Sequence, residues 1–117
     1  MSQTAAFALT LAIEVPIVLA LALWRGWAPG AGWRLFLVAI GANALTHPLL
    51  WLSLAEGAPG SSIPFGARVA LLELGATLIE GVLYAFPAGL GMRRGCLSSL
   101  VANATSTGIG FAIYAFF

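Results

Sequence analysis

Four long apolar segments dominate the sequence and restrict what the chain can fold into. They run roughly over residues 5–24, 33–54, 65–86 and 97–117. Each is close to the length of about 20 apolar residues that an α-helix needs to cross the hydrocarbon core of a bilayer. Only 8% of the residues are charged, whereas a soluble domain carries about 25%. The sequence therefore predicts an all-α membrane protein with four transmembrane helices in a single domain over residues 1–117.

Three short connections rich in Gly, Pro and Arg separate the apolar segments. Four of the five arginines fall in or beside the first and third connections, residues 25–32 and 87–96, and only Arg68 lies near the second. Cytoplasmic loops carry an excess of arginine and lysine. We therefore expect the first and third connections to be cytoplasmic and both termini to lie outside, in a bacterial inner membrane.

The first half of the sequence resembles the second half. The first and third segments contain "AIEVPIVLA" and "LIEGVLYAF", which align Glu14 with Glu80. The second and fourth contain "GANALTHPL" and "VANATSTGI", which align Asn43 with Asn103. This pattern indicates a two-helix hairpin duplicated in tandem, an arrangement known from transporters. Chance similarity between alanine-rich helices is the alternative.

Polar residues recur at helical spacing within each apolar segment. Asn43, Thr46 and His47, for example, are spaced i, i+3 and i+4, so they share one helix face. Because lipid offers no hydrogen bonds, these faces are expected to turn inward and form a polar interior. The candidate residues for binding a substrate or an ion are Glu14, Asn43, Thr46, His47, Glu73, Glu80, Asn103 and Ser106.

Three carboxyls belong to this predicted interior, and no arginine or lysine lies at a matching depth. An ionised carboxylate without a partner is too costly to persist there. Each glutamate must therefore be protonated, share a proton with a neighbour, pair with an imidazolium at His47, or hold a bound cation. Pro16 and Pro48 free the backbone carbonyls of Ala12 and Ala44, which are further oxygen ligands.

The favoured function is transport or conduction of a cation or a protonated small molecule, which the carboxyls would bind in competition with protons. Oxygen ligands favour hard ions, although the sequence contains no confident metal site and indicates no cofactor. Four helices make a thin wall, so we expect a homodimer in the lipid bilayer. The net charge of +1 argues against nucleic acid as a partner.

Two other functions stay open. An intramembrane enzyme would use His47 and Glu80 as base and acid on a lipid or a hydrophobic metabolite. The sequence favours a protein that is not an enzyme, because it has one histidine and no H-E-x-x-H motif. The third interpretation is a non-catalytic subunit of a membrane complex, in which the polar groups only fix helix register.

The pattern of Glu14, "NALTHPLLW", Glu73, Glu80 and "NATSTGIG" resembles a set of small four-helix bacterial integral membrane proteins of unknown function, across essentially the whole chain. The chain is also similar to the small multidrug resistance transporters, which have four helices and an essential glutamate in the first helix, comparable to Glu14. That second resemblance implies a membrane transporter and is limited to this one residue. Those transporters lack the His47-Pro48 pair and the two acids of the third segment.

Overall fold

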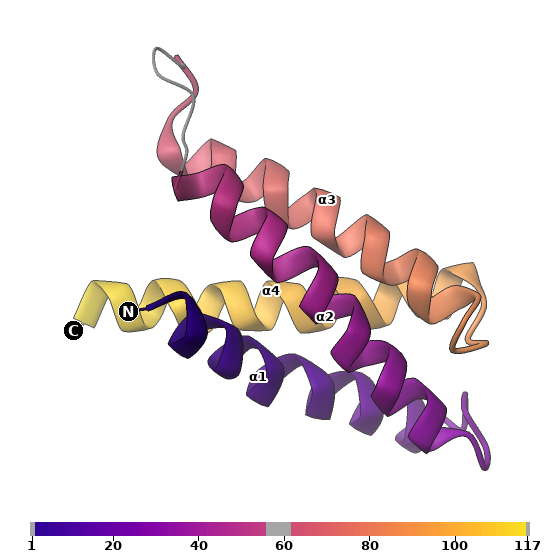
Figure 1. Ribbon diagram of the computed structural model, residues 1–117. Coiled ribbons are helices and arrows are strands. Elements are labelled where there is room, and N and C mark those ends of the chain that lie inside the picture. Colours follow the sequence, from indigo (N-terminus) through magenta and orange to yellow (C-terminus); the bar gives the residue numbers. More distant parts are fainter. Residues whose placement is uncertain (1, 56–61, 117) are drawn as a thin grey trace.

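The chain folds into four α-helices, which the computed structural model describes for residues 2–55 and 62–116. The helices are α1 (Gln3–Trp24), α2 (Gly32–Ala55), α3 (Phe65–Ala85) and α4 (Met92–Phe116). Helices α1 and α3 each pack against both α2 and α4, so the four form a bundle in which α1 and α3 are diagonal neighbours (Figure 1). The predicted all-α fold is confirmed, and the described residues contain no strand.

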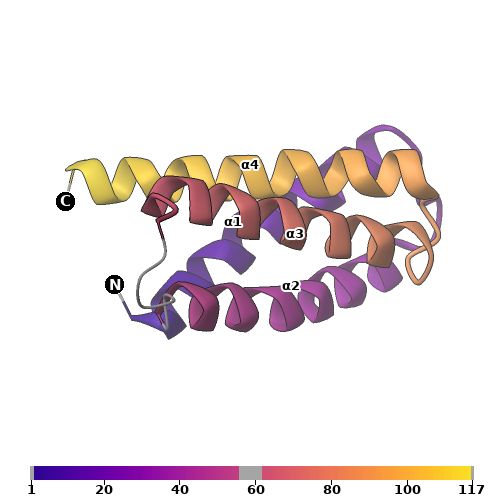
Figure 2. The ribbon, with the colours of Figure 1, turned by 90° about the horizontal axis from the view of Figure 1, so that it is seen from above.

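Neighbouring helices run antiparallel, as short connections require. The amino end of α1 and the carboxyl end of α4 lie at one end of the bundle, and the α1–α2 and α3–α4 turns lie at the other (Figure 2). These two turns are tight and contain glycines with positive φ, at Gly26 and Gly30 in the first and at Gly89 and Gly91 in the second. Glycine adopts this conformation without steric cost.

Helices α1, α2 and α4 are long and apolar enough to cross a membrane, and α3 is borderline. The polar residues of α3 explain the difference, since this helix carries Arg68, Glu73 and Glu80. The outer surface of all four helices is apolar, with exposed side chains that include Leu37, Leu45, Leu71, Leu78, Leu100 and Phe111. Such a surface suits lipid rather than water as the solvent, as expected of an integral membrane protein.

One helix boundary differs from the sequence expectation. Helix α4 begins at Met92, five residues before the predicted start at residue 97, so Arg93 and Arg94 belong to its first turn rather than to the connection. The prediction treated these arginines as loop residues. An arginine at a helix end can instead extend its guanidinium to the membrane interface while its backbone stays helical.

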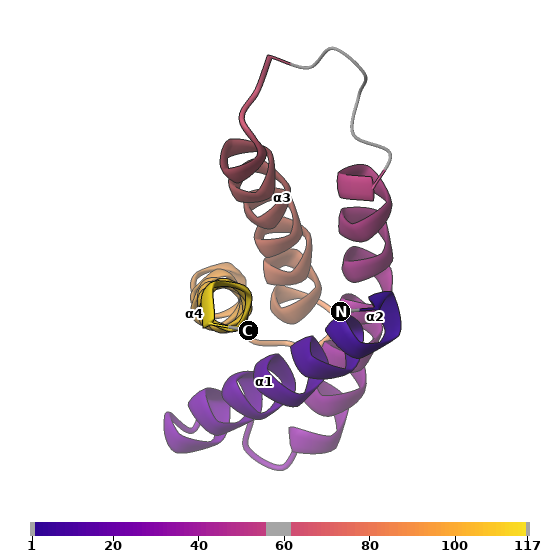
Figure 3. The same cartoon turned by 90° about the vertical axis from the view of Figure 1, so that its left-hand side faces the viewer.

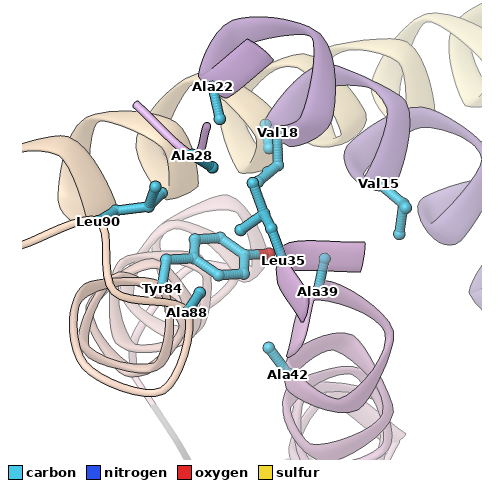
Figure 4. Packing of buried hydrophobic residues seen from close by; sticks show 11 residues of the cluster. Val15, Val18, Ala22, Ala28, Leu35, Ala39, Ala42, Tyr84, Ala88 and Leu90 are labelled. Atoms are coloured by element: carbon cyan, nitrogen blue, oxygen red, sulfur yellow. The ribbon is translucent and has the colours of Figure 1, made fainter. Parts of the chain in front are cut away.

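The hydrophobic core occupies the half of the bundle that carries the two turns. It comprises Val15, Val18, Ala22, Ala28, Leu35, Ala39, Ala42, Tyr84, Ala88, Leu90 and Ala102. Tyr84 of α3 reaches into the centre of this cluster toward Leu35 of α2 (Figure 4). Its ring is fully buried, and its hydroxyl has no hydrogen-bond partner among the described residues.

Replacing Tyr84 by phenylalanine is therefore expected to stabilise the protein. A buried polar atom without a partner costs about 1–3 kcal/mol, and Tyr84→Phe removes that atom while keeping the ring. The measurement is thermal unfolding of the detergent-solubilised protein. Tyr114→Phe is the matched control, because Tyr114 is 88% exposed and its change should leave the melting temperature unaltered. A lower melting temperature in Tyr84→Phe would contradict the prediction.

Candidate functional site

A cavity of about 460 Å³ lies between the four helices, in the half of the bundle opposite the core. It extends from buried Glu14 and Glu80 to exposed Phe65 and Tyr114. Phe65 begins α3 and Tyr114 lies near the end of α4, so the cavity reaches the end of the bundle where the chain termini lie. This end faces the viewer in Figure 3. No residue of the hydrophobic core lines it. The structure brings all eight candidate residues to this one cavity: Glu14, Asn43, Thr46, His47, Glu73, Glu80, Asn103 and Ser106.

Glu80 is hydrogen-bonded to side chains of the two helices that flank α3. Its side chain is 1% exposed. The Thr46 hydroxyl of α2 lies 2.5 Å from Glu80 Oε1, and the Asn103 amide of α4 donates to Glu80 Oε2 over 2.6 Å. Both carboxyl oxygens therefore have a partner.

Glu14 is equally buried but has fewer partners. Its Oε1 forms a short hydrogen bond with the Ser106 hydroxyl of α4, and the Asn43 side chain of α2 lies beside the carboxyl. Glu14 Oε2 is buried and has no partner among the described residues. Glu14, which lines the cavity, thus keeps one buried carboxyl oxygen that is not yet hydrogen-bonded.

The two hydroxyls beside the carboxyls each have two oxygens within hydrogen-bonding distance. Thr46 Oγ1 lies 3.1 Å from the Ala42 carbonyl oxygen of its own helix as well as close to Glu80. Ser106 Oγ likewise lies 3.1 Å from the Asn103 carbonyl oxygen as well as close to Glu14. A hydroxyl has one hydrogen to donate, so it cannot supply both full hydrogen bonds.

The polar contacts repeat with the period of the predicted duplication. The alignment that pairs Asn43 with Asn103 also pairs Thr46 with Ser106, and each glutamate contacts the hydroxyl of the opposite hairpin. The aligned asparagines also make equivalent contacts: Asn43 donates to the carbonyl oxygen four residues earlier over 3.1 Å, and Asn103 does so over 3.0 Å. The site therefore consists of two similar halves.

The outer part of the cavity departs from this symmetry. The His47 ring lies 5.3 Å from the Phe7 ring and 6.5 Å from the Trp51 ring, measured between centroids, and its buried Nε2 has no partner within residues 2–55 and 62–116. The positions aligned with His47 and Phe7 are Thr107 and Glu73, whose side chains are also neighbours. One half is thus aromatic, and the other carries the half-buried third carboxyl.

Sequence reasoning missed one polar contributor, Ser99. It is fully buried, its hydroxyl donates to the Thr77 carbonyl oxygen over 2.8 Å, and it lies 3.2 Å from the Asn103 amide. The signal was present, because a residue four positions before Asn103 shares its helix face. Ser99 ties α4 to α3 beneath the carboxyls and so helps to fix Asn103.

The described lining residues supply no lysine or arginine to the cavity. Within residues 2–55 and 62–116, no cluster of three or more His, Cys, Asp or Glu residues has a geometry that suits a metal ion. The site can therefore offer carboxyl, amide and hydroxyl groups in apolar surroundings. The oxygen atoms of these groups suit an ammonium or another cationic group better than an anion.

Comparison with protein-family models, with curated proteins and with solved structures finds no match to this chain. The resemblances stated from the sequence stay predictions, and the function has to be argued from the site itself.

Proposed function

We propose that this protein binds a cation or a protonated small molecule in its cavity and transports it across a bacterial inner membrane. The observation that carries the proposal is the pair of buried carboxyls, Glu14 and Glu80, which line one cavity whose described lining contains no lysine or arginine. An ionised carboxylate in an apolar interior requires a compensating positive charge. A cationic ligand supplies that charge.

The neighbouring hydroxyls support a proton as the occupant of each carboxyl when no cation is bound. If Thr46 donates its single hydrogen to the Ala42 carbonyl oxygen, its contact with Glu80 needs a hydrogen from the carboxyl. The same reasoning applies to the second pair. If Ser106 donates its hydrogen to the Asn103 carbonyl oxygen, its contact with Glu14 needs a hydrogen from that carboxyl. Both carboxyls are then neutral without ligand, and a cation binds by displacing a proton.

The asymmetry of the bundle supports a transport cycle. The cavity reaches one end of the bundle, and the hydrophobic core lies between the carboxyls and the other end. Transport requires the site to be exposed to each side in turn, and repeated halves that rock against each other provide such a movement. The core around Tyr84 is the part that must open in the second state.

The proposed orientation places the cavity mouth outside and the two turns in the cytoplasm. Arg25 and Arg94 lie over the Trp27 ring, 5.8 and 5.7 Å from its centroid, at the end of the bundle where the turns lie. Aromatic side chains are typical of both membrane interfaces, and an excess of arginine is typical of the cytoplasmic one. All eight candidate residues come from one chain, so a homodimer is compatible with the site but is not needed to complete it.

The contacts favour transport over the enzymatic alternative. An acid–base pair of His47 and Glu80 needs both side chains to reach a substrate and to transfer protons to or from it. Glu80 is instead bonded to Thr46 and Asn103, and His47 Nε2 has no partner among the described residues. The non-catalytic alternative does not account for the unpartnered Oε2 of Glu14 beside a cavity of this size.

Thermal stability of the detergent-solubilised protein tests the proposal. The measurement uses inorganic monovalent and divalent cations and protonated alkyl amines, each at several pH values. A ligand that binds only the folded protein at about 100 times its Kd stabilises it by about 2.7 kcal/mol. We expect at least one cation to raise the melting temperature, and the shift to shrink as the pH falls, because protons compete for the carboxyls. If no cation shifts the melting temperature at any pH, the proposal is wrong.

A further inference from the structure

We infer that the natural ligand carries two positive charges separated by an apolar chain, as in a linear alkyl diamine, and that its binding displaces two protons, one from Glu14 and one from Glu80. This inference rests on the proposed function and specifies its substrate class. It follows from the duplicated site, from the charge balance of the cavity and from the nature of the cavity walls.

The cavity offers two carboxyls in similar settings rather than one. Glu14 and Glu80 are each 1% exposed, each is bonded to a hydroxyl of the opposite hairpin, and each has an asparagine side chain beside it. They reach the cavity from α1 and α3, which are diagonal in the bundle. A ligand with one cationic group satisfies only one of these half-sites.

Charge balance favours a ligand with two cationic groups. With both carboxyls protonated, the pair is neutral. Binding of a diammonium ligand breaks the two carboxyl O–H bonds, forms two ammonium–carboxylate pairs and releases two protons to water, so the pair with its ligand is again neutral. A monocation displaces one proton and leaves the second carboxyl protonated. Neutral states are favoured because the surroundings are apolar.

The cavity that both half-sites line suits an alkyl chain. Its volume of about 460 Å³ falls within the range of cavities that hold small organic molecules. Apolar side chains that include Leu9, Ile13, Val69 and Ala76 line it from α1 and α3. A bare metal ion would leave these walls unused.

Other titratable groups face the same cavity and have to be separated from the pair. They are Glu73 of α3, His47 of α2 and Tyr114 of α4, and Tyr84 lies in the core one helical turn from Glu80. Glu73 and His47 lie toward the cavity mouth and are only half-buried. The inference therefore assigns the two displaced protons to the two fully buried carboxyls.

Counting protons tests the inference. Isothermal titration calorimetry of the detergent-solubilised protein at pH 6, in two buffers that differ in ionisation enthalpy, gives the number of protons released per bound ligand. The probes are a series of linear alkyl diamines of increasing length and the monoamines of the same length. We expect two protons for the diamines and one for the monoamines. The best diamine should bind about tenfold or more tightly than its matched monoamine, because it forms a second charged hydrogen-bonded pair.

Variants assign the protons to residues. Glu14→Gln and Glu80→Gln should each reduce the count for a diamine to one and remove the advantage of the second amine. Thr105→Val is the control, because the Thr105 hydroxyl bonds only to the Val101 carbonyl oxygen of its own helix; it should still release two protons.

The outcomes separate this inference from the proposed function. Three results would overturn the inference and leave cation binding intact. They are the release of one proton by diamines and monoamines alike, the release of three protons by a diamine, and equal affinities for the two classes of amine. Absence of binding by every amine and every inorganic cation would overturn the proposed function, and the inference with it. Because the wild-type titration alone decides the count, a variant that fails to fold does not leave the inference untested.

Discussion

Glu14→Gln is expected to weaken cation-induced stabilisation strongly and to abolish transport, while the substituted protein folds and unfolds like the wild type. The first part follows from Glu14, which lines the cavity and whose buried Oε2 has no partner among the described residues. Removing one partner of a buried charge pair costs about 2 kcal/mol or more, which corresponds to at least about a 30-fold loss of affinity. The measurements are the thermal shift with the best cation and its flux into proteoliposomes.

The second part of this prediction follows from the proton count at the hydroxyls. Glutamine resembles a protonated glutamate in size and charge, and its amide can donate to the Ser106 hydroxyl as the protonated carboxyl does. The melting temperature without ligand should therefore stay close to that of the wild type, and it should vary less with pH. Glu80→Gln is expected to act in the same direction, because the aligned carboxyl contacts Thr46 in the same way.

Thr105→Val serves as the control for both glutamine variants. Thr105 lies on α4 close to Ser106, but its hydroxyl bonds to the backbone of its own helix. Its replacement should leave cation binding and flux unchanged. If transport survives in both Glu14→Gln and Glu80→Gln, then the carboxyls are structural and the transporter interpretation fails.

Much of this site could be predicted from the sequence, because a membrane places few demands on a helix other than where its polar groups point. Polar side chains at helical spacing have to face the bundle interior, and all eight candidate residues do line one cavity. The internal alignment also indicated that Glu14 and Glu80 have equivalent roles. The hydroxyl partners of these glutamates, Ser106 and Thr46, are aligned with each other as well.

The hydroxyl partners of the two glutamates could not be predicted in the same way. The sequence did not indicate that Glu14 is hydrogen-bonded to Ser106 of α4, although the Asn43 side chain of α2 lies beside the same carboxyl. Spacing along one helix fixes which residues share a face, but it does not fix which neighbouring helix that face meets. The first turn of α4 was missed for a related reason, since Arg93 and Arg94 are compatible with both a loop and a helix end.

The closest helix contact depends on a residue that the sequence pattern did not single out, and Gly95→Ala is expected to disrupt it. A Cβ atom at Gly95 would lie 2.5 Å from the Gly81 carbonyl oxygen and 2.7 Å from the Ala85 nitrogen. Both are backbone atoms of α3, so no side-chain rotation relieves the clash, and α3 and α4 must move apart. Overpacking of this kind costs about 1–3 kcal/mol, occasionally more.

Thermal unfolding in detergent measures the effect, with Gly108→Ala as the matched control on the same helix. A Cβ at Gly108 meets nothing within 4 Å, so this change should be neutral or stabilise α4 by about 0.5–1 kcal/mol through its helix propensity. The melting temperature of Gly81→Ala should lie between those of Gly95→Ala and Gly108→Ala, because the added Cβ would lie 3.0 Å from the Cys96 sulfur. Equal melting temperatures for Gly95→Ala and Gly108→Ala would show that the close packing of α3 on α4 is not required.

The same substitution should also weaken cation binding, although Gly95 lies outside the cavity. The contact of α3 with α4 sets the 2.6 Å hydrogen bond from Asn103 to Glu80 and the 2.8 Å hydrogen bond from Ser99 to the Thr77 carbonyl oxygen. Separating the two helices lengthens both, so Glu80 loses a donor that stabilises its ionised form. Gly95→Ala is therefore expected to lower the affinity of the Glu80 half-site more than that of the Glu14 half-site. In the proton count for a diamine, that difference appears as a fall from two toward one.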